Sequence, residues 1–202
     1  MGPAAWKPAW GMLALSASLW AGQQHAALVT VLLDFEAPHS EASVAALQQE
    51  AQRLLGEAGI RIQVGMRDET PPSAVFEKLL LFHMKGRCAM DPYPVLFDER
   101  GPLAMTYTSN GVILPFGEIR CDQVKISLKR TFTGSDYQHG DALLGTALGR
   151  VLVHEMYHIL AGTGTHTSHG VTRECLSSEA LRAPSAWIGA EALARLRTSP
   201  VP

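Results

Sequence analysis

The sequence predicts an α+β fold, in which a mixed β-sheet carries a leading helix, a long central helix and a small helical C-terminal part. Three observations support this fold class. The first third of the chain has the pattern of strand, helix and strand, an Asn-Gly pair near the middle is typical of a β-hairpin, and residues 141–161 form one apolar helical stretch. The 202 residues contain no internal repeat, so we expect one domain over residues 23–202.

Hydrophobic spacing predicts the first three elements. Residues 27–35 are a short apolar run typical of a buried strand, and residues 60–64 alternate as a half-buried strand does. Between them, Ser40 is a candidate N-cap for a helix that reaches about Glu57, with Gly59 as its stop. A unit of this length predicts that the two strands are parallel.

Strand and turn patterns dominate the middle of the chain. Residues 76–82 predict a third strand. After a loop that contains several prolines, residues 103–107 and 111–116 predict a hairpin around the Asn-Gly pair at 110–111. Residues 123–128, QVKISL, predict one further strand.

The central helix is predicted over residues 141–161, where there is no proline and where leucine or alanine stands on nearly every turn. Asp141 is its expected N-cap, and Gly162 is expected to end it in the left-handed conformation. A helix that is apolar on most faces is predicted to be buried.

Short helices are predicted on the C-terminal side of the central helix. Residues 177–181 and 190–197 have the pattern of such helices, and Trp187 between them is an expected core anchor. Residues 131–140 form a polar loop that leads into the central helix.

The central helix contains the run His154-Glu155-Met156-Tyr157-His158, an H-E-x-x-H pattern. Residues four apart lie on the same face of a helix, so His154 and His158 can offer both imidazoles to one metal ion. Glu155 is rotated by about 100°, which places it beside the ion, where a general base for water belongs. Tyr157 points away from Glu155 and is expected to pack. The alternative is a structural helix with core histidines, but the glycine stop and a third histidine, His166, favour a zinc site.

In these residues the chain resembles the zincin metallopeptidases and, within them, the metzincins, because a third histidine follows the glycine turn. His154, Glu155 and His158 match the first half of the metzincin pattern H-E-x-x-H-x-x-G-x-x-H. The longer string also resembles small uncharacterised bacterial exported proteins that carry an H-E-x-x-H helix. The resemblance implies a zincin-like domain with His154, His158 and His166 as metal ligands.

The second half of the metzincin pattern is changed in this chain. The glycine of the pattern falls on Ala161, and its last histidine falls on Gly164, so two extra residues precede His166. The glycine-containing segment in between is flexible enough to absorb them. No methionine follows Met156, so the Met-turn of the metzincins is missing.

Several residues are candidates for the third metal ligand. His166 is favoured because it follows a glycine-rich reversal that can fold the chain back over the helix. His169 is the main histidine alternative. Glu179 is the alternative of a gluzincin-type site, in which the third ligand comes from a later helix, and Glu174 is a further candidate. For His169, Glu174 and Glu179 we prefer the interpretation of a solvated surface side chain.

The resemblance implies zinc-dependent hydrolysis of peptide bonds. Zn²⁺ held by three histidines keeps a fourth position for water and can bring the pKa of that water to about 7. Glu155 would take the proton of the water and pass it to the leaving amine. The partner is a peptide or protein substrate, which the edge of the hairpin at 103–116 would hold in extended form. Tyr137 and His139 are candidate oxyanion stabilisers.

Two other function classes stay open. The chain would be a catalytically silent zinc-binding protein if the ion only tied the C-terminal segment to the helix. It would be a non-peptidase hydrolase if the same ion acted on another bond. Glu155 argues against the first class, because a purely structural site needs no base there.

The composition is typical of a globular protein and argues against several classes of partner. Hydrophobic residues make up 47% of the chain, charged residues 18%, and the formal net charge is -2. The 17 Lys and Arg residues form no run, so we expect no nucleic-acid partner and no binding to an anionic membrane surface. We expect a monomer.

The N-terminus predicts a signal peptide over residues 1–22. Lys7 precedes an apolar stretch at about residues 10–21, which is too short to span a bilayer. We therefore expect a secreted or periplasmic protein with no membrane contact after cleavage. An uncleaved anchor or a buried N-terminal helix is the alternative.

The three cysteines are consistent with export. Cys88 and Cys121 lie near the ends of two predicted strands and are the expected disulfide in an oxidising compartment, which leaves Cys175 over. In a reducing compartment all three would be free thiols. None has the C-x-x-C spacing of a thiolate zinc site.

Overall fold

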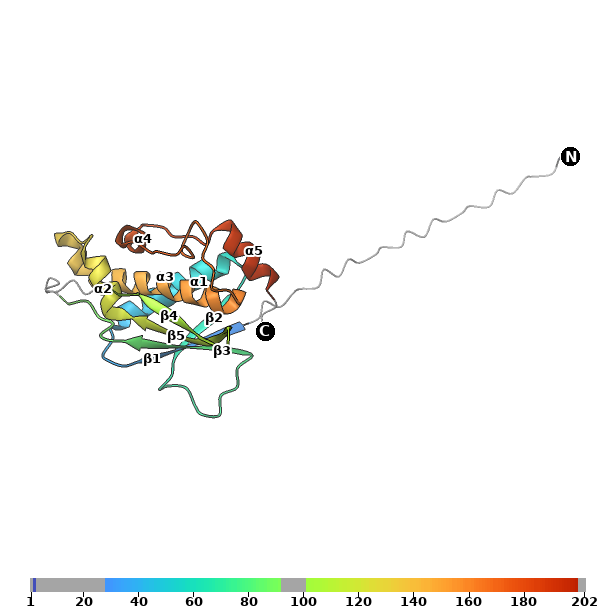
Figure 1. Cartoon of the computed structure of the whole chain (residues 1–202), viewed down its shortest axis with the longest axis horizontal. Coiled ribbons are helices and arrows are strands. Elements are labelled where there is room, and N and C mark those ends of the chain that lie inside the picture. Colours follow the sequence, from blue (N-terminus) through green and yellow to red (C-terminus); the bar gives the residue numbers. More distant parts are fainter. Residues whose placement is uncertain (1, 3–27, 92–100, 200–202) are drawn as a thin grey trace.

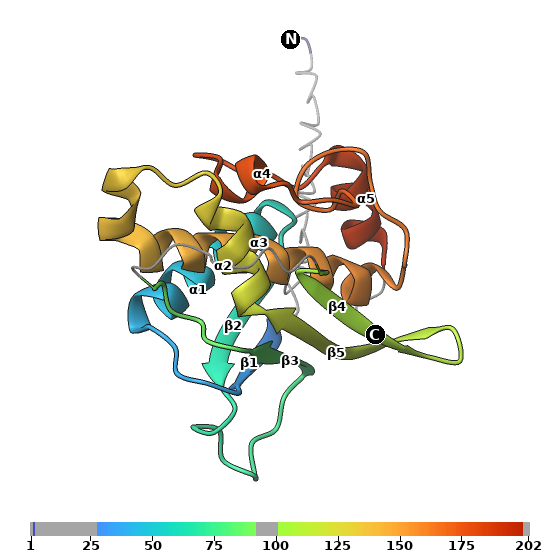
Figure 2. The ribbon, with the colours of Figure 1, turned by 60° about the vertical axis from the view of Figure 1, so that its left-hand side comes forward.

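One mixed β-sheet forms the base of the fold, and two layers of helix and loop lie on one of its faces. The structure is a computed structural model, which describes residues 2, 28–91 and 101–199. Helices α1 (Glu41–Glu57) and α3 (Gly140–Ala161) lie side by side against the sheet (Figure 1). The C-terminal segment, with α4 (Ser178–Arg182) and α5 (Ala190–Thr198), lies on the far side of α3 (Figure 2). The predicted α+β fold with a central helix is confirmed.

The remaining elements form the sheet and its connection to α3. They are β1 (Leu28–Phe35), β2 (Arg61–Met66), β3 (Lys78–Lys85), β4 (Ala104–Ser109), β5 (Val112–Arg120), α2 (Cys121–Lys129) and a 3₁₀ helix, η1 (Gly134–His139). The strands predicted at 27–35, 60–64 and 76–82 correspond to β1, β2 and β3, and the predicted hairpin corresponds to β4 and β5.

The strands of the sheet lie in the order β2-β1-β3-β5-β4. β1 pairs in parallel with β2 and β3, β3 pairs in parallel with β5, and β4 is antiparallel to β5. The parallel pairing of β1 and β2 across α1 confirms the predicted strand-helix-strand unit. In the β4–β5 turn, Asn110 and Gly111 have φ values of 50° and 78°, as a tight hairpin turn requires.

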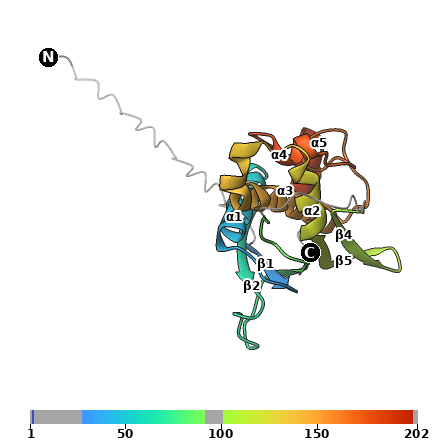
Figure 3. The same cartoon turned by 90° about the vertical axis from the view of Figure 1, so that its left-hand side faces the viewer.

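Among the described residues, helices pack against one face of the sheet and leave the other open, as Figure 3 shows. In β3, Leu80, Phe82 and Met84 are fully buried. Leu79, the residue before Leu80, points to the other face and is 39% exposed. Phe116 of β5 is 44% exposed on the same open face, where it pairs in register with Leu81. This alternation follows from the two-residue period of a strand. Side chains on the helix-covered face are therefore the ones that can contact α3.

Glycines in α3 allow α1 to approach closely. A Cβ atom at Gly145 would overlap the carbonyl oxygen of Ser43, and one at Gly149 would lie 2.8 Å from the carbonyl oxygen of Leu47. Only glycine fits without displacing the backbone of α1. The position of α3 over the sheet is therefore fixed by its contact with α1.

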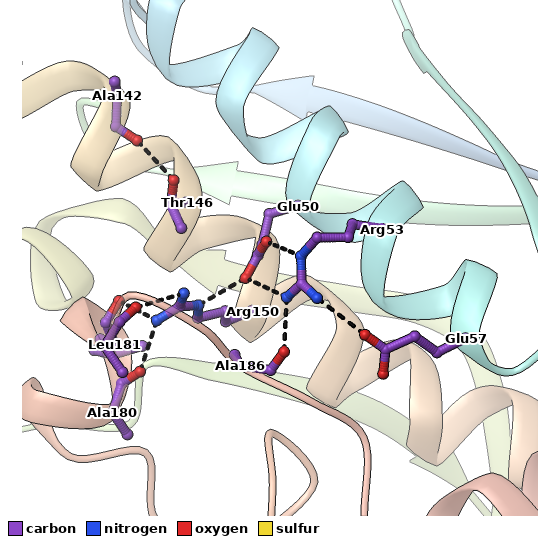
Figure 4. A network of polar contacts seen from close by, with 10 residues as sticks. Glu50, Arg53, Glu57, Ala142, Thr146, Arg150, Ala180, Leu181 and Ala186 are labelled. Carbon is purple, nitrogen blue, oxygen red and sulfur yellow. Dashed lines mark hydrogen bonds and ion pairs between the residues drawn. The ribbon is translucent and has the colours of Figure 1, made fainter.

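A buried network of charged groups fastens the C-terminal segment to these two helices (Figure 4). Arg150 of α3 is 2% exposed and forms an ion pair with Glu50 of α1 at 2.8 Å. Burial alone would raise the pKa of Glu50, but hydrogen bonds and charges from Arg53 and Arg150 hold it below its usual value of 4.5. Both guanidinium groups also donate hydrogen bonds to backbone carbonyls of the C-terminal segment, those of Ala180, Leu181, Ala183 and Ala186.

Cys88 and Cys121 form a disulfide, which confirms the predicted pairing. Cys88 follows β3 and Cys121 follows β5, and because these strands are parallel neighbours, the two Cα atoms lie 5.0 Å apart. The bridge spans 33 residues, and closing a loop of that length is worth about 4 kcal/mol in the chain-entropy treatment. Cys175 is free and exposed. A disulfide of this kind favours an oxidising compartment.

The strand predicted at residues 123–128 is wrong, because this segment is the helix α2. Val124, Ile126 and Leu128 alternate in sequence as a strand would. The buried residues, however, are spaced three or four apart as on one helix face, and they are Cys121, Val124, Lys125 and Leu128.

Two residues predicted as structural anchors have other roles. Trp187 is 56% exposed, because side chains alternate along this segment and its neighbours Ala186 and Ile188 are the buried ones. Asp141 is not the N-cap, since α3 begins at Gly140 as a continuation of η1. Its carboxylate instead accepts a hydrogen bond from the backbone N–H of Met90 at 2.6 Å.

Within the described residues, no helix is both long enough and apolar enough to cross a membrane. The signal peptide predicted at residues 1–22 lies outside those residues, apart from Gly2, and stays a prediction.

Candidate metal centre

Helix α3 presents His154 and His158 on one buried face. The two side chains are 8% and 7% exposed. The Nδ1 atom of His154 lies 2.9 Å from the carbonyl oxygen of Val171, and the Nδ1 atom of His158 lies 2.7 Å from that of Thr163. Each imidazole is therefore held in orientation by a backbone carbonyl, as histidines that bind metals usually are.

The end of α3 turns the chain so that His166 reaches the other two histidines. Gly162 has φ 59° and ψ 34°, so the predicted left-handed stop of the helix is confirmed. The ring centroid of His166 lies 5.1 Å from that of His154 and 4.8 Å from that of His158. Candidate ligand atoms of all three histidines lie within 4.8 Å of one another. The three could therefore hold one metal ion.

The hydrogen bonds of His154 and His158 leave both Nε2 atoms free for a metal. A carbonyl oxygen only accepts hydrogen bonds, so each Nδ1 carries the proton, and Nε2 of a neutral ring then has a lone pair. The two Nε2 atoms lie 3.2 Å apart. Two lone pairs at this distance repel unless they share a cation. Two nitrogens bound to one tetrahedral ion such as zinc at about 2.0–2.1 Å are roughly 3.3 Å apart, so a single metal ion can bridge a pair of donors at this spacing.

Burial keeps the candidate ligands in the form that binds metal. The pKa of His154 is lowered to about 4, mainly by burial and also by the charges of His158 and His166. The hydrogen bond to the Val171 carbonyl acts in the opposite direction. Burial also lowers the pKa of His166, and the charge of Glu174 opposes this. At neutral pH both rings are therefore neutral, as metal binding requires.

Glu155 lies beside the histidines and is fixed by a residue of the sheet. Its side chain is buried, and its Oε2 atom accepts a hydrogen bond of 2.6 Å from the Thr106 hydroxyl on β4. Burial raises the pKa of Glu155 above its usual 4.5. The Thr106 hydrogen bond and the charge of His158 lower this pKa but do not cancel the effect of burial. A raised pKa makes the carboxylate a stronger base. Thr106 was not identifiable from the sequence, because the pattern predicts its strand but not its partner.

The three histidines and Glu155 lie in a cleft of about 450 Å³. α3 forms its floor, while β4 and the C-terminal segment form its walls. The wall residues include Ala104, Met105 and Thr106 on β4 and Glu174, Cys175 and Leu176 in the C-terminal segment. Because β4 is the edge strand, its unpaired backbone groups border this cleft.

A further set of hydrogen bonds holds the loop that carries His166. Arg195 on α5 donates to the hydroxyl of Tyr157 at 3.0 Å and to that of Thr165 at 2.6 Å. Tyr157 is fully buried, which confirms its predicted packing role. Arg195 was not identified from the sequence, because it lies 38 residues from Tyr157 and belongs to no motif.

The other candidate residues do not belong to the group of three histidines, and most of them lie outside the cleft. His169 and Glu179 are exposed and line a separate cavity of about 390 Å³. Glu174 lines the cleft without joining the histidine group. Tyr137 and His139 line a third cavity of about 400 Å³ at the N-terminal end of α3. His139 precedes His154 by four helical turns, roughly 22 Å, so neither residue serves the metal centre.

Comparison with known proteins adds no family to this description: no protein-family model, no curated protein and no solved structure matches the chain.

Proposed function

We propose that this chain is an exported zinc-dependent peptidase, in which His154, His158 and His166 bind the metal and Glu155 is the general base. The observation that carries the proposal is the 3.2 Å approach of two imidazole Nε2 atoms, both with the proton on Nδ1, beside a buried carboxylate. A purely structural site would have no use for that carboxylate.

Zinc in such a site supplies a Lewis acid that polarises a carbonyl and lowers the pKa of water. Glu155 accepts the proton of the attacking water, the water oxygen bonds to the carbonyl carbon, and Glu155 passes the proton to the amine as the C–N bond breaks. Thr106 keeps the carboxylate in place through its hydrogen bond.

The walls of the cleft support a peptide or protein as the substrate class. β4 lies at the edge of the sheet, and its residues border the cleft next to Glu155. An extended peptide that pairs with this edge would carry its backbone carbonyls past the histidines. A peptide or protein therefore fits the site better than a compact small molecule does.

The proposal is tested with a peptide library and a Glu155→Gln variant. We expect the wild type to cleave peptides, and the variant to keep its zinc and lose at least about a hundredfold in rate, because general-base catalysis contributes that much. Glu179→Gln, an exposed glutamate outside the cleft, is the matched control and should stay active. A fully active Glu155→Gln would rule out this base.

The same experiment, extended to small esters and amides, separates the two alternative functions. Zinc content without cleavage of any peptide would identify a catalytically silent zinc-binding protein. Hydrolysis of small esters or amides alone would identify a non-peptidase hydrolase.

A further inference from the structure

Apart from the histidines and the general base, the described lining of the cleft presents one charged side chain to a ligand. Many of its lining residues are apolar, such as Leu103 and Ile113. Among the described lining residues, Glu155 and Glu174 are the only carboxylates, and none is Lys or Arg. Glu155 is buried and hydrogen-bonded to Thr106, so Glu174 is the carboxylate of this lining that stands exposed to a ligand.

The carboxylate of Glu174 has no partner of its own within residues 28–91 and 101–199, where no hydrogen bond or ion pair involves it. Elsewhere in the described residues, Asp136 pairs with Arg182 and Glu191 pairs with Arg195. Glu174 is exposed and lines the cleft together with His166. It therefore borders the same space as the third histidine.

The backbone that carries Glu174 is held in place. Thr172, two residues earlier, is fully buried, and its carbonyl accepts a hydrogen bond of 3.0 Å from the N–H of Thr167. The hydroxyls of these two threonines lie 2.6 Å apart. The carbonyl of Val171 accepts the hydrogen bond from His154. The backbone two and three residues before Glu174 is thus tied to the loop of Thr167 and to His154.

We infer that Glu174 recognises a cationic nitrogen of the substrate, an inference that rests on the proposed peptidase function. In a peptide this cation is a Lys or Arg side chain or the α-amino group of the first residue, and all of these pair with a carboxylate. A solvated ion pair is worth up to about 1 kcal/mol, or about fivefold in affinity.

The test uses matched peptides and the full zinc-loaded chain. Three fluorescent alanine peptides are compared: an N-acetylated one with an internal lysine, its norleucine counterpart, and the norleucine peptide with a free N-terminus. Binding is measured in the Glu155→Gln background, where it does not depend on turnover, and cleavage in the otherwise unchanged chain. We expect about fivefold tighter binding of the lysine or the free-amine peptide than of the neutral one, weakened by salt. The peptide that shows the gain identifies the source of the cation.

Variants of Glu174 provide the control for this preference. Glu174→Gln should abolish it, Glu174→Lys should reverse it in favour of a glutamate-containing peptide, and Glu179→Gln, with the same change in charge, should leave it intact. A preference that survives Glu174→Gln, or that is absent from the parent protein, overturns the inference. Charge-selective binding without cleavage supports the role of Glu174 and contradicts the peptidase proposal. Cleavage without charge selectivity supports the peptidase proposal and contradicts the role of Glu174.

Discussion

Replacing Arg150 by methionine should destabilise the protein strongly, although Arg150 does not line the cleft. The side chain is 2% exposed and pairs with Glu50. It also donates to three backbone carbonyls of the C-terminal segment, at 2.8 to 3.0 Å. Methionine fills a similar volume but leaves these acceptors without a donor.

The expected loss is about 3–5 kcal/mol, the cost of removing one partner of a buried ion pair. For a domain of this size each kcal/mol lowers Tm by about 2–4 °C, so a loss of about 4 kcal/mol lowers Tm by roughly 8–16 °C. Arg53→Met is the matched control, because Arg53 belongs to the same network but its side chain is 42% exposed. Its loss should be about 1 kcal/mol or less.

Urea unfolding followed by circular dichroism measures both variants, with an unchanged m value as the sign that only stability has changed. If Arg150→Met lost no more than Arg53→Met, the reasoning that burial makes this network strong would be refuted.

Three further predictions concern the network, the helix crossing and the His166 loop. Because the folded-state pKa of Glu50 lies below its usual 4.5, its contribution exists above that pH and is lost as the pH falls through the lowered pKa. The difference in free energy of unfolding between wild type and Glu50→Gln, measured with urea, should therefore be constant near neutral pH. It should shrink as the pH falls below about 4.5. Gly145→Ala should cost about 1–3 kcal/mol in urea unfolding because its methyl overlaps α1, whereas Gly56→Ala, with open space around it, should not destabilise. Arg195→Met should weaken zinc binding about tenfold in chelator competition, because the loop of His166 loses its anchor, and unchanged affinity would disprove that role.

The parts of the site that depend on local sequence were predictable. Four-residue spacing alone places His154 and His158 on one helix face, and Gly162 adopts the left-handed φ of 59° that its place after the apolar run indicated. The Asn-Gly turn of the hairpin is equally local, because only the two turn residues need a positive φ.

The parts that depend on distant contacts were not predictable from one sequence. Thr106 and Glu155 are 49 residues apart, and Arg150 and Glu50 are 100 apart, so no short pattern joins them. Trp187 illustrates the same limit, because hydrophobicity favoured burial but its exposed position depends on which neighbours face the core. Residues 123–128 fit both helical and strand spacing, and their packing against α3 decided in favour of the helix.

The metal content of the purified chain, measured by elemental analysis for the wild type, His166→Ala and Glu179→Ala, tests the central claim most directly. The three-histidine centre predicts about one zinc per wild-type chain, a sharp reduction in His166→Ala and full retention in Glu179→Ala. No zinc in the wild type, or zinc that is lost with Glu179 and kept without His166, would contradict this account.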